Sequence, residues 1–365
     1  MVDQPTILIL GKLPPPIIGP AIATNIILNS SLKERFNLVH FDTRINAEIA
    51  TMGKLSFNKF LKSFDLFRKY KAVIKKEQPD LILIPISQTT VGFTKDAIFI
   101  RIGAKYAKVA VQLRGSNIKN WLATANGVTN NFVVKTLKKC AGVIVLGNNL
   151  KYLFQEYFSL DNIYVVPNGA DYELEKNQSD ELTVLYLANF LPSKSFDDVL
   201  KAVTILKEKK VTNFKLQAAG AWDNPKFKKE CLALIKQHEL TNVELFSPQS
   251  GAAKMQLFAN ATVFVFCPKM PEGHPWVIVE AMANGLPIIA TDQGAIIESV
   301  IDGENGFIVP TEDPTFIAKR LEKLINDESL RKQFSEESRA LYLANFTEEK
   351  MVKNLSEVFL SVLEK

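Results

Sequence analysis

The chain has 365 residues, of which 47% are apolar and 23% charged. This length favours about two domains, and the composition excludes disordered, collagen-like and low-complexity chains. The net charge of +5 hides an asymmetry, because residues 1–170 carry 22 Lys/Arg and 10 Asp/Glu (+12), whereas the remainder carries 22 and 29 (−7). We therefore expect the two halves to meet different partners, with anionic partners favoured for the first half.

The cysteines and the apolar runs indicate the cellular compartment in which the protein is expected. Cys140, Cys231 and Cys267 are far apart and form no Cys-x-x-Cys pair, which argues against a zinc ribbon or a disulfide framework and favours a reducing environment. The first residues lack the basic start of a signal peptide. The longest uncharged run, residues 13–32, contains four prolines and would not span a bilayer as a helix. A cytoplasmic location is expected.

Ten short apolar runs alternate with helix-length amphipathic segments. Continuous apolar strands separated by helices are typical of parallel, doubly wound α/β sheets. Two sets of five predict two Rossmann-like domains that face each other across a cleft, with ligands bound beyond the carboxyl ends of the strands. The runs are Thr6–Leu10, Leu81–Ile86, Val109–Leu113, Val143–Leu146 and Ile163–Val166, then Val184–Leu187, Phe214–Ala218, Val243–Phe246, Val263–Phe266 and Pro287–Ala290.

A domain boundary is predicted near residue 170. The polar, acidic segment Asp171–Glu181 has no apolar periodicity and directly follows Pro167-Asn168-Gly169-Ala170, so it is the predicted linker. We expect an N-terminal domain over residues 1–170 and a C-terminal domain over residues 171–346. The last helix, about residues 347–365, is expected to pack back on the first domain.

The loop after the first strand is rich in proline. The strand ends at Gly11, and a helix is predicted to begin near Gly19 and Pro20, because proline suits the first helical position. Gly19 lets the backbone approach a ligand, and a helix N-terminus attracts anions; a turn stiffened by proline is the structural alternative. The loop has neither Gly-x-Gly-x-x-Gly nor Gly-Lys-Ser/Thr, which argues against a dinucleotide oxidoreductase and against a P-loop.

Residues 54–71 predict a basic amphipathic helix. Six Lys/Arg against one Asp give this segment a charge of +5. Such a helix is typical either of an anionic membrane interface or of a core-facing helix with a solvated basic face, and the basic first half favours the membrane. The apolar face comprises Phe57, Phe60, Leu61, Phe64 and Phe67.

A lysine precedes a predicted helix in the second half. The strand Val184–Leu187 leads into a loop in which Lys194 stands just before a helix predicted over Phe196–Lys210. A cation there opposes the helix dipole unless it faces an anion. A bound phosphate would account for it, and a solvated surface lysine is the alternative.

Residues 271–287, PEGHPWVIVEAMANGLP, are the most informative stretch. Pro275 is expected to open a helix and Gly285 to close it. Glu272 lies in the preceding loop, and Glu280 lies two turns into the helix. The N–H groups of residues 273–277 gather at the helix start, where they can hold a polar ligand.

This order of strand, glutamate loop, small-residue helix and Gly-Leu-Pro resembles the Glu-x7-Glu signature of the retaining GT-B glycosyltransferases, glycosyltransferase family 4. Similar segments follow the family order at the loop to Gly19 and at residues 167–171, 189–195, 219–222, 291–294 and 302–307. The resemblance implies metal-independent transfer of a sugar from a nucleotide-diphosphate-sugar donor to a lipid-linked or polysaccharide acceptor in bacterial surface-glycan synthesis. It assigns the acceptor to the first domain and the donor to the second.

The resemblance also implies individual roles. Glu280 should bind the donor ribose, Glu272 should lie beside the sugar ring, and Lys194 with Gly19 should bind the diphosphate. Fixed cations and N–H dipoles stabilise the charge that grows on the leaving group, so neither a metal nor a further cofactor is expected. The rest of the predicted donor site comprises Asn189, Gly273, His274, Pro275, Trp276 and Val277.

Two positions depart from the family pattern. Asn189 stands where many relatives have Arg, and Arg114 stands where many have His before Gly. Arginine is no base near neutrality, but it can bind phosphate or an anionic acceptor, and we count Arg114 with Glu272 and Lys194 as the expected catalytic residues. For the His274 ring, packing on the sugar or its neighbours is favoured over catalysis, and for Trp276, packing against the core is favoured over stacking on the donor base.

Two other functions stay open from the sequence alone. One is a GT-B synthase of a soluble sugar product, and the other is a sugar-nucleotide-binding protein without turnover. A peripheral contact of residues 54–71 with the inner membrane face argues against the first. Nucleic acid is not an expected partner, because the basic half contains no reading motif.

Overall fold

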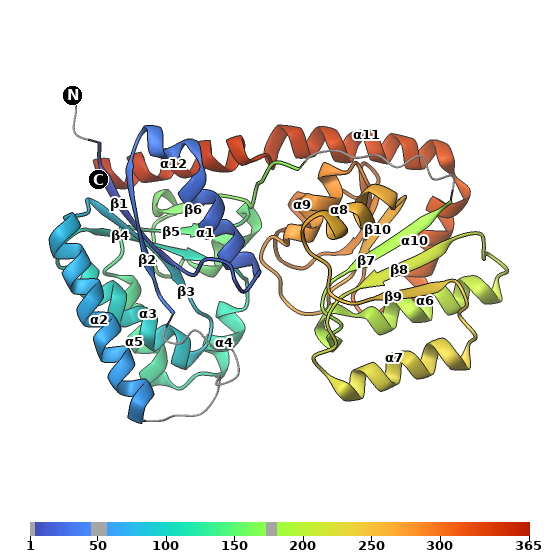
Figure 1. Ribbon diagram of the computed structural model, residues 1–365, viewed down its shortest axis with the longest axis horizontal. Helices are drawn as coiled ribbons and strands as arrows, with labels where there is room; N and C mark the ends of the chain where they lie inside the picture. The colour runs from blue at the N-terminus through green and yellow to red at the C-terminus, as the bar shows by residue number, and fades with distance from the viewer. Residues whose placement is uncertain (1–3, 45–56, 173–180) are drawn as a thin grey trace. The chain divides into compact units, whose positions relative to one another are not determined.

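A computed structural model describes residues 4–44, 57–172 and 181–365, without the side chains of residues 57–63. The chain forms two compact units. The first unit comprises Met1–Pro167 and Glu348–Lys365, and the second comprises Asn168–Thr347 (Figure 1). Each unit contains one parallel six-stranded sheet between helices.

The sheet of the first unit has the order β2-β1-β3-β4-β5-β6. Because β2 lies on one side of β1 and β3 on the other, the direction of winding reverses between β1 and β3. The strands are β1 (Thr6–Gly11), β2 (Asn37–Asp42), β3 (Leu81–Ile86), β4 (Lys108–Leu113), β5 (Gly142–Val145) and β6 (Ile163–Val165). The helices are α1 (Gly19–Asn29), α2 (Phe57–Glu77), α3 (Thr90–Gly103), α4 (Ile118–Thr124), α5 (Gly127–Leu137) and α12 (Glu348–Glu364).

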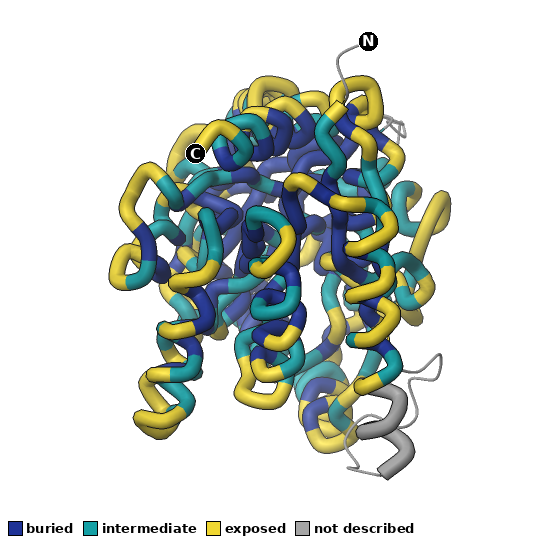
Figure 2. Tube along the Cα trace, turned by 90° about the vertical axis from the view of Figure 1, so that its left-hand side faces the viewer, coloured by how far each residue is buried: buried dark blue, intermediate teal, exposed yellow. Residues whose placement is uncertain are grey.

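The C-terminal helix α12 is part of the first unit. Phe359 meets Phe36 edge to face, with the ring centroids 5.5 Å apart. Arg35 Nη1 donates a hydrogen bond of 2.9 Å to Ser356 Oγ. The last residues of the chain are therefore held by segments more than 300 positions earlier in the sequence. Figure 2, which looks at this unit, shows buried strands inside a shell of half-exposed helices.

The sheet of the second unit has the order β12-β11-β10-β7-β8-β9, and its winding reverses between β7 and β10. The strands are β7 (Thr183–Leu187), β8 (Lys215–Ala219), β9 (Val243–Phe246), β10 (Val263–Phe266), β11 (Ile288–Thr291) and β12 (Gly306–Val309). The helices are α6 (Phe196–Glu208), α7 (Pro225–Gln237), α8 (Gly251–Asn260), α9 (Trp276–Ala283), α10 (Pro314–Asn326) and α11 (Glu328–Asn345).

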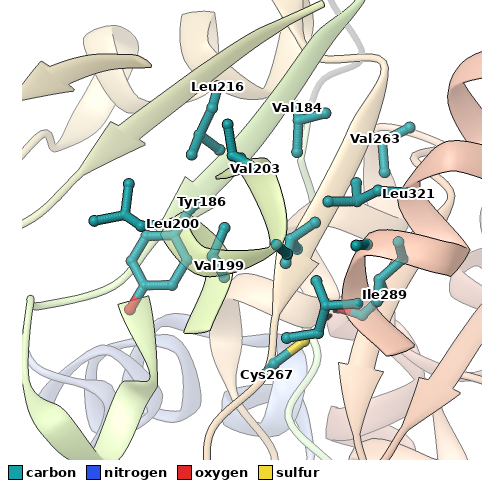
Figure 3. Close-up of a cluster of buried hydrophobic side chains, with 14 of the residues drawn as sticks. Val184, Tyr186, Val199, Leu200, Val203, Leu216, Val263, Cys267, Ile289 and Leu321 are labelled. Atoms are coloured by element: carbon teal, nitrogen blue, oxygen red, sulfur yellow. Dashed lines mark hydrogen bonds between the residues drawn. The ribbon is translucent and has the colours of Figure 1, made fainter. Parts of the chain in front are cut away.

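Both faces of the second sheet are buried. Val184 and Tyr186 of β7 pack with residues of α6 and α10, such as Val203 and Leu321 (Figure 3). Leu185, between them in the sequence, belongs to the cluster on the opposite face, with residues of α8 and α9. Successive residues of a strand point to opposite faces, so burial on both faces requires a continuous apolar run.

The predicted doubly wound sheets are confirmed, and each of the ten predicted strands lies within one residue of an observed strand. The prediction missed β2 and β12, which are edge strands. The residues of β2 are mostly half-exposed, so its sequence mixes polar and apolar residues. In β12, a Cβ on Gly306 would lie 2.1 Å from the carbonyl oxygen of Ile288, so glycine is required where the two strands approach.

Helix α2 divides the apolar face predicted for residues 54–71. Phe67 packs against Phe99 with the centroids 4.9 Å apart, and Tyr70 and Ile74 are buried. Phe64, by contrast, is 67% exposed, because the buried face of the helix runs through Leu66 rather than through Phe64. The remaining side chains of the predicted face, at residues 57, 60 and 61, lie outside the described residues, as does most of the predicted linker.

Among the helices of the described ranges, none combines the length and the hydropathy that crossing a bilayer requires.

Candidate functional site

An ion pair lies at the carboxyl ends of β7 and β10. Open parallel sheets bind ligands where the winding reverses, and in the second sheet that point lies between these two strands. Lys194 follows β7 and Glu272 follows β10, and Lys194 Nζ donates a hydrogen bond to Glu272 Oε1. Only 25% of the lysine side chain and 16% of the glutamate side chain are exposed. The structure thus brings together two predicted site residues that are 78 positions apart.

The backbone around Lys194 is fixed from two sides. Residues Pro192–Lys194 form a single 3-10 turn, and the next residue, Ser195, has a left-handed backbone with φ +56. The hydroxyl of the fully buried Tyr186 donates a hydrogen bond of 3.2 Å to the carbonyl oxygen of Lys194. The N–H of Lys269, after β10, donates to the carbonyl oxygen of Ser193 at 3.1 Å. The core therefore determines where the Lys194 side chain begins.

Glu280 is a buried carboxylate on α9, only 4% exposed. Its Oε1 accepts hydrogen bonds from Lys254 Nζ at 2.5 Å and from the Tyr172 hydroxyl at 3.4 Å. Burial raises the pKa of this carboxyl, and the two donors partly offset that rise. Its Oε2 is buried and has no hydrogen-bond partner among the described residues. A buried acceptor without a partner costs about 1–3 kcal/mol, so a ligand hydroxyl at Oε2 would be favourable.

Lys254 and Tyr172 were not among the residues predicted from the sequence. Lys254 lies in the first turn of α8, where a cation opposes the helix dipole just as Lys194 does before α6. The same physical signal therefore applied to it. No such signal marks Tyr172, which lies 108 residues before its carboxylate partner.

The loop that carries Glu272 is held through its main chain. Gly273 is buried, and its carbonyl oxygen accepts a 2.8 Å hydrogen bond from the N–H of Ala295. Gly294 has φ +62, and a Cβ there would lie 1.9 Å from the carbonyl oxygen of Glu272. Only glycine permits this approach. The segment after β11 therefore fixes the position of the backbone at Glu272.

The helix after this loop agrees with the sequence prediction. Pro275 caps α9 at its start, and Gly285, with φ +62, follows its end. Trp276, the first helical residue, is 9% exposed and packs inward, as predicted. Val277 is half-buried.

His274 connects the glutamate loop to residues at the beginning and at the end of the second unit in the sequence. The N–H of Asn168 donates to its Nδ1 at 3.0 Å, and its Nε2 is 2.8 Å from Ser299 Oγ. The ring packs against Phe346, with the centroids 5.1 Å apart. Burial lowers the pKa of the imidazole to about 4. Because both ring nitrogens are hydrogen bonded inside the unit, the side chain has a packing role there, and packing of the ring on a donor sugar stays a prediction.

Three other predicted residues, Asn189, Gly19 and Arg114, have contacts of their own. Asn189, after β7, is exposed and donates a 3.3 Å hydrogen bond to Asp223 Oδ2, which links the loops after β7 and β8. Gly19 and Arg114 belong to the first unit, where Gly19 begins α1. Arg114 Nη2 donates a 2.8 Å hydrogen bond to Gln112 Oε1. Burial lowers the pKa of its guanidinium to about 10, which leaves it a cation at neutral pH.

Comparison with known proteins identifies the second unit. Residues 171–341 match the family model of glycosyl transferases group 1. The second unit belongs to this family. An uncharacterized glycosyltransferase of Haemophilus influenzae is 28% identical over 82% of this chain and 81% of its own length. The capsular polysaccharide biosynthesis glycosyltransferase CapM of Staphylococcus aureus is 28% identical over 65% of this chain and 60% of its own length.

The fold of the whole chain is also that of the glycosyltransferases. Anabaena HepE, solved in complex with UDP and glucose, superposes with a TM-score of 0.74 at 16% identity, over 98% of this chain and 100% of that one. The GT-B fold predicted from the sequence is confirmed.

The buried imidazole of His274 predicts a pH-dependent stability. Its pKa is about 4 in the folded chain against an ordinary 6.5, so the unfolded chain binds the proton first as the pH falls. This contribution is complete above pH 6.5 and is lost between pH 6.5 and about 4, to a total of about 3 kcal/mol. In urea titrations, the stability deficit of His274→Gln should therefore shrink as the pH falls from 7.5 to 5.

A matched control is His238→Gln at the end of α7. A His274→Gln deficit that stays constant with pH would show that the imidazole titrates normally.

The Lys254–Glu280 pair predicts a second pH-dependent effect. Lys254→Met leaves a buried carboxylate without its cation, which should lower the free energy of unfolding by about 3–5 kcal/mol at pH 7.5. The loss should shrink toward pH 5, because protonation of Glu280 removes the buried charge. Urea titrations at the two pH values measure both quantities. The double variant Lys254→Met/Glu280→Gln is the control, and a double variant as unstable as the single one would contradict this reasoning.

Proposed function

We propose that the protein is a retaining glycosyltransferase that moves a sugar from a nucleotide-diphosphate-sugar donor to a lipid-linked or polysaccharide acceptor in bacterial surface-glycan synthesis. The observation that carries the proposal is the contact of Lys194 with Glu272 at the reversal of the second sheet. The capsular role in the name of CapM supports the type of product, and the UDP and glucose held by HepE support the class of donor.

Lys194 supplies the charge that the leaving group requires. When the bond from the anomeric carbon to the diphosphate breaks, negative charge collects on the phosphate oxygens. A fixed, largely buried cation stabilises that charge more than a solvated one does, and this is our basis for a reaction without a metal ion. Glu272 holds the ammonium group in position and lies beside the sugar ring in the proposed complex.

Glu280 supplies binding rather than chemistry. Its Oε1 is held by Lys254 and Tyr172, which leaves Oε2 to accept a hydrogen bond from a ribose hydroxyl of the donor. This contact is the same in the ground state and the transition state, so it contributes mainly to donor affinity.

Retention follows if the acceptor attacks from the side that the diphosphate leaves. The acceptor oxygen then bonds to the anomeric carbon on that face, the bond from this carbon to the phosphate oxygen breaks, and the acceptor proton passes to the departing phosphate oxygen. No protein base is required. The guanidinium of Arg114 is a cation at neutral pH, so its role is to bind an anion.

Kinetics of three variants test these roles. Lys194→Ala should lower kcat by about 10²–10³, because its charge acts mainly in the transition state. Glu280→Gln should mainly raise the donor KM, and Glu272→Gln should lower kcat as well. Lys209→Ala is a matched control, because this exposed lysine follows the end of α6 and is paired with Glu322 of α10. Near-normal turnover of Lys194→Ala would contradict the proposed site.

We further propose that α2 contacts an anionic membrane surface. Phe64 is exposed, and Arg68, Lys71 and Lys75 are exposed at helical spacings from it. An exposed aromatic ring beside several cations is typical of interfacial helices, and each cation near an anionic surface contributes about 1 kcal/mol.

Sedimentation with anionic vesicles tests this contact. Phe64→Ser should release the protein without unfolding it, because the ring is exposed. Phe67→Ser is the comparison, and it should destabilise the fold, because that ring packs against Phe99. A wild-type protein that stays in the supernatant at low salt would contradict the membrane contact and would leave the transferase proposal intact.

A further inference from the structure

The first unit contains a cavity of about 310 Å³ at the carboxyl ends of β1, β3 and β4. Its walls include Gly11 at the end of β1 and Ile86 at the end of β3. The winding of this sheet reverses between the same two strands, and that is where doubly wound sheets of this order bind ligands. The volume lies at the lower end of the range for small-molecule sites, which suits a group about the size of a sugar ring.

Cations outnumber acids in the wall of this cavity. Lys12, Lys95 and Arg114 line it, and Asp96 is the acid among the described lining residues. Lys95 Nζ is 3.9 Å from Asp96 Oδ1, while Asp96 Oδ2 accepts a 2.7 Å hydrogen bond from the N–H of Ser87. Burial lowers the pKa of Lys95, the nearby Asp96 partly offsets that lowering, and repulsion from Lys12 adds a smaller lowering. An anionic ligand would offset the repulsion between Lys12 and Lys95.

The wall also contains a buried acceptor. Gln88 lines the cavity, and its Oε1 is buried without a hydrogen-bond partner in the described part of the chain. Its amide nitrogen is packed so closely that a Cβ on Gly115 would lie 2.2 Å from it. A buried amide oxygen requires a donor, and a hydroxyl group is the donor that a sugar or polyol supplies.

We propose that this cavity binds the phosphate of a hydroxylated acceptor. Lys12, Lys95 and Arg114 would hold the phosphate, and Gln88 would accept a hydrogen bond from a neighbouring hydroxyl. Arg114 suits this role because the planar fork of a guanidinium matches phosphate oxygens. The inference rests on the proposed function in one respect only, which is that the ligand is the acceptor. A neutral acceptor would make no ion pair with these cations, so the cavity favours a phosphorylated acceptor over a neutral one.

Calorimetric titration of the full chain tests the site without turnover. Glycerol 3-phosphate should bind, whereas glycerol should show no measurable binding. Lys12→Gln and Lys95→Gln should each lower the affinity for glycerol 3-phosphate by about tenfold, because each variant removes one charge-assisted contact. Lys95→Arg should retain most of the affinity. Lys105→Gln is the matched control, because this exposed lysine precedes β4 and so lies at the opposite end of that strand.

Titration of the same variants with nucleoside diphosphates separates the two phosphate sources. Unchanged diphosphate affinity in Lys12→Gln and Lys95→Gln supports an acceptor site. Weakened diphosphate affinity with unchanged glycerol 3-phosphate affinity would assign the cations to the donor and overturn the inference. Equal glycerol 3-phosphate affinity in wild type and variants, or no binding at all, would also overturn it.

Two further arms complete the design. A polyprenyl diphosphate in micelles that displaces glycerol 3-phosphate supports a lipid-linked acceptor, and failure to displace it supports a soluble phosphorylated one. If the wild type binds no nucleoside diphosphate and no nucleotide sugar, the proposed donor site fails. The cavity is then judged independently by the glycerol 3-phosphate arm.

Discussion

The ion pair between Lys194 and Glu272 is the contact around which the second unit is arranged. Parallel strands place their following loops at one edge, and the reversal of winding makes the loops after β7 and β10 neighbours there. The pair is mostly buried, so its charges are weakly screened. The hydroxyl of Tyr186 fixes the lysine backbone, and Gly294 fixes the glutamate backbone. The two opposite charges are thereby held in place in the absence of any ligand, as the proposed role of Lys194 toward a leaving diphosphate requires.

The same topological constraint gives the first unit a cavity at the reversal of its own sheet. Its sheet reverses between β1 and β3, and the cavity with Lys12, Lys95 and Arg114 opens at that point. The +12 charge of residues 1–170 is therefore not spread evenly over the first unit, because part of it lines the cavity at the reversal of the sheet. In this account each unit presents cations to a phosphate, with the donor assigned to the second unit and the acceptor to the first.

The sequence predicted those parts of the structure that depend on local patterns. Continuous apolar runs such as Val184–Leu187 located the buried strands, because both faces of the second sheet are covered. The spacing of Glu272 and Glu280 and the position of Lys194 marked the candidate site. The pairing of Lys254 with Glu280 could not be predicted, because it depends on how α8 packs beside α9. The edge strand β2 was missed because its residues are half-exposed and lack a continuous apolar run.

The central claim is that the cation at the reversal of the second sheet binds the donor diphosphate. Its most direct test compares nucleoside diphosphate with the corresponding monophosphate by calorimetric titration of wild type and Lys194→Ala. The account predicts that the wild type prefers the diphosphate by at least about tenfold, as one charge-assisted contact provides, and that Lys194→Ala loses this preference. An equal preference in both proteins would contradict the account.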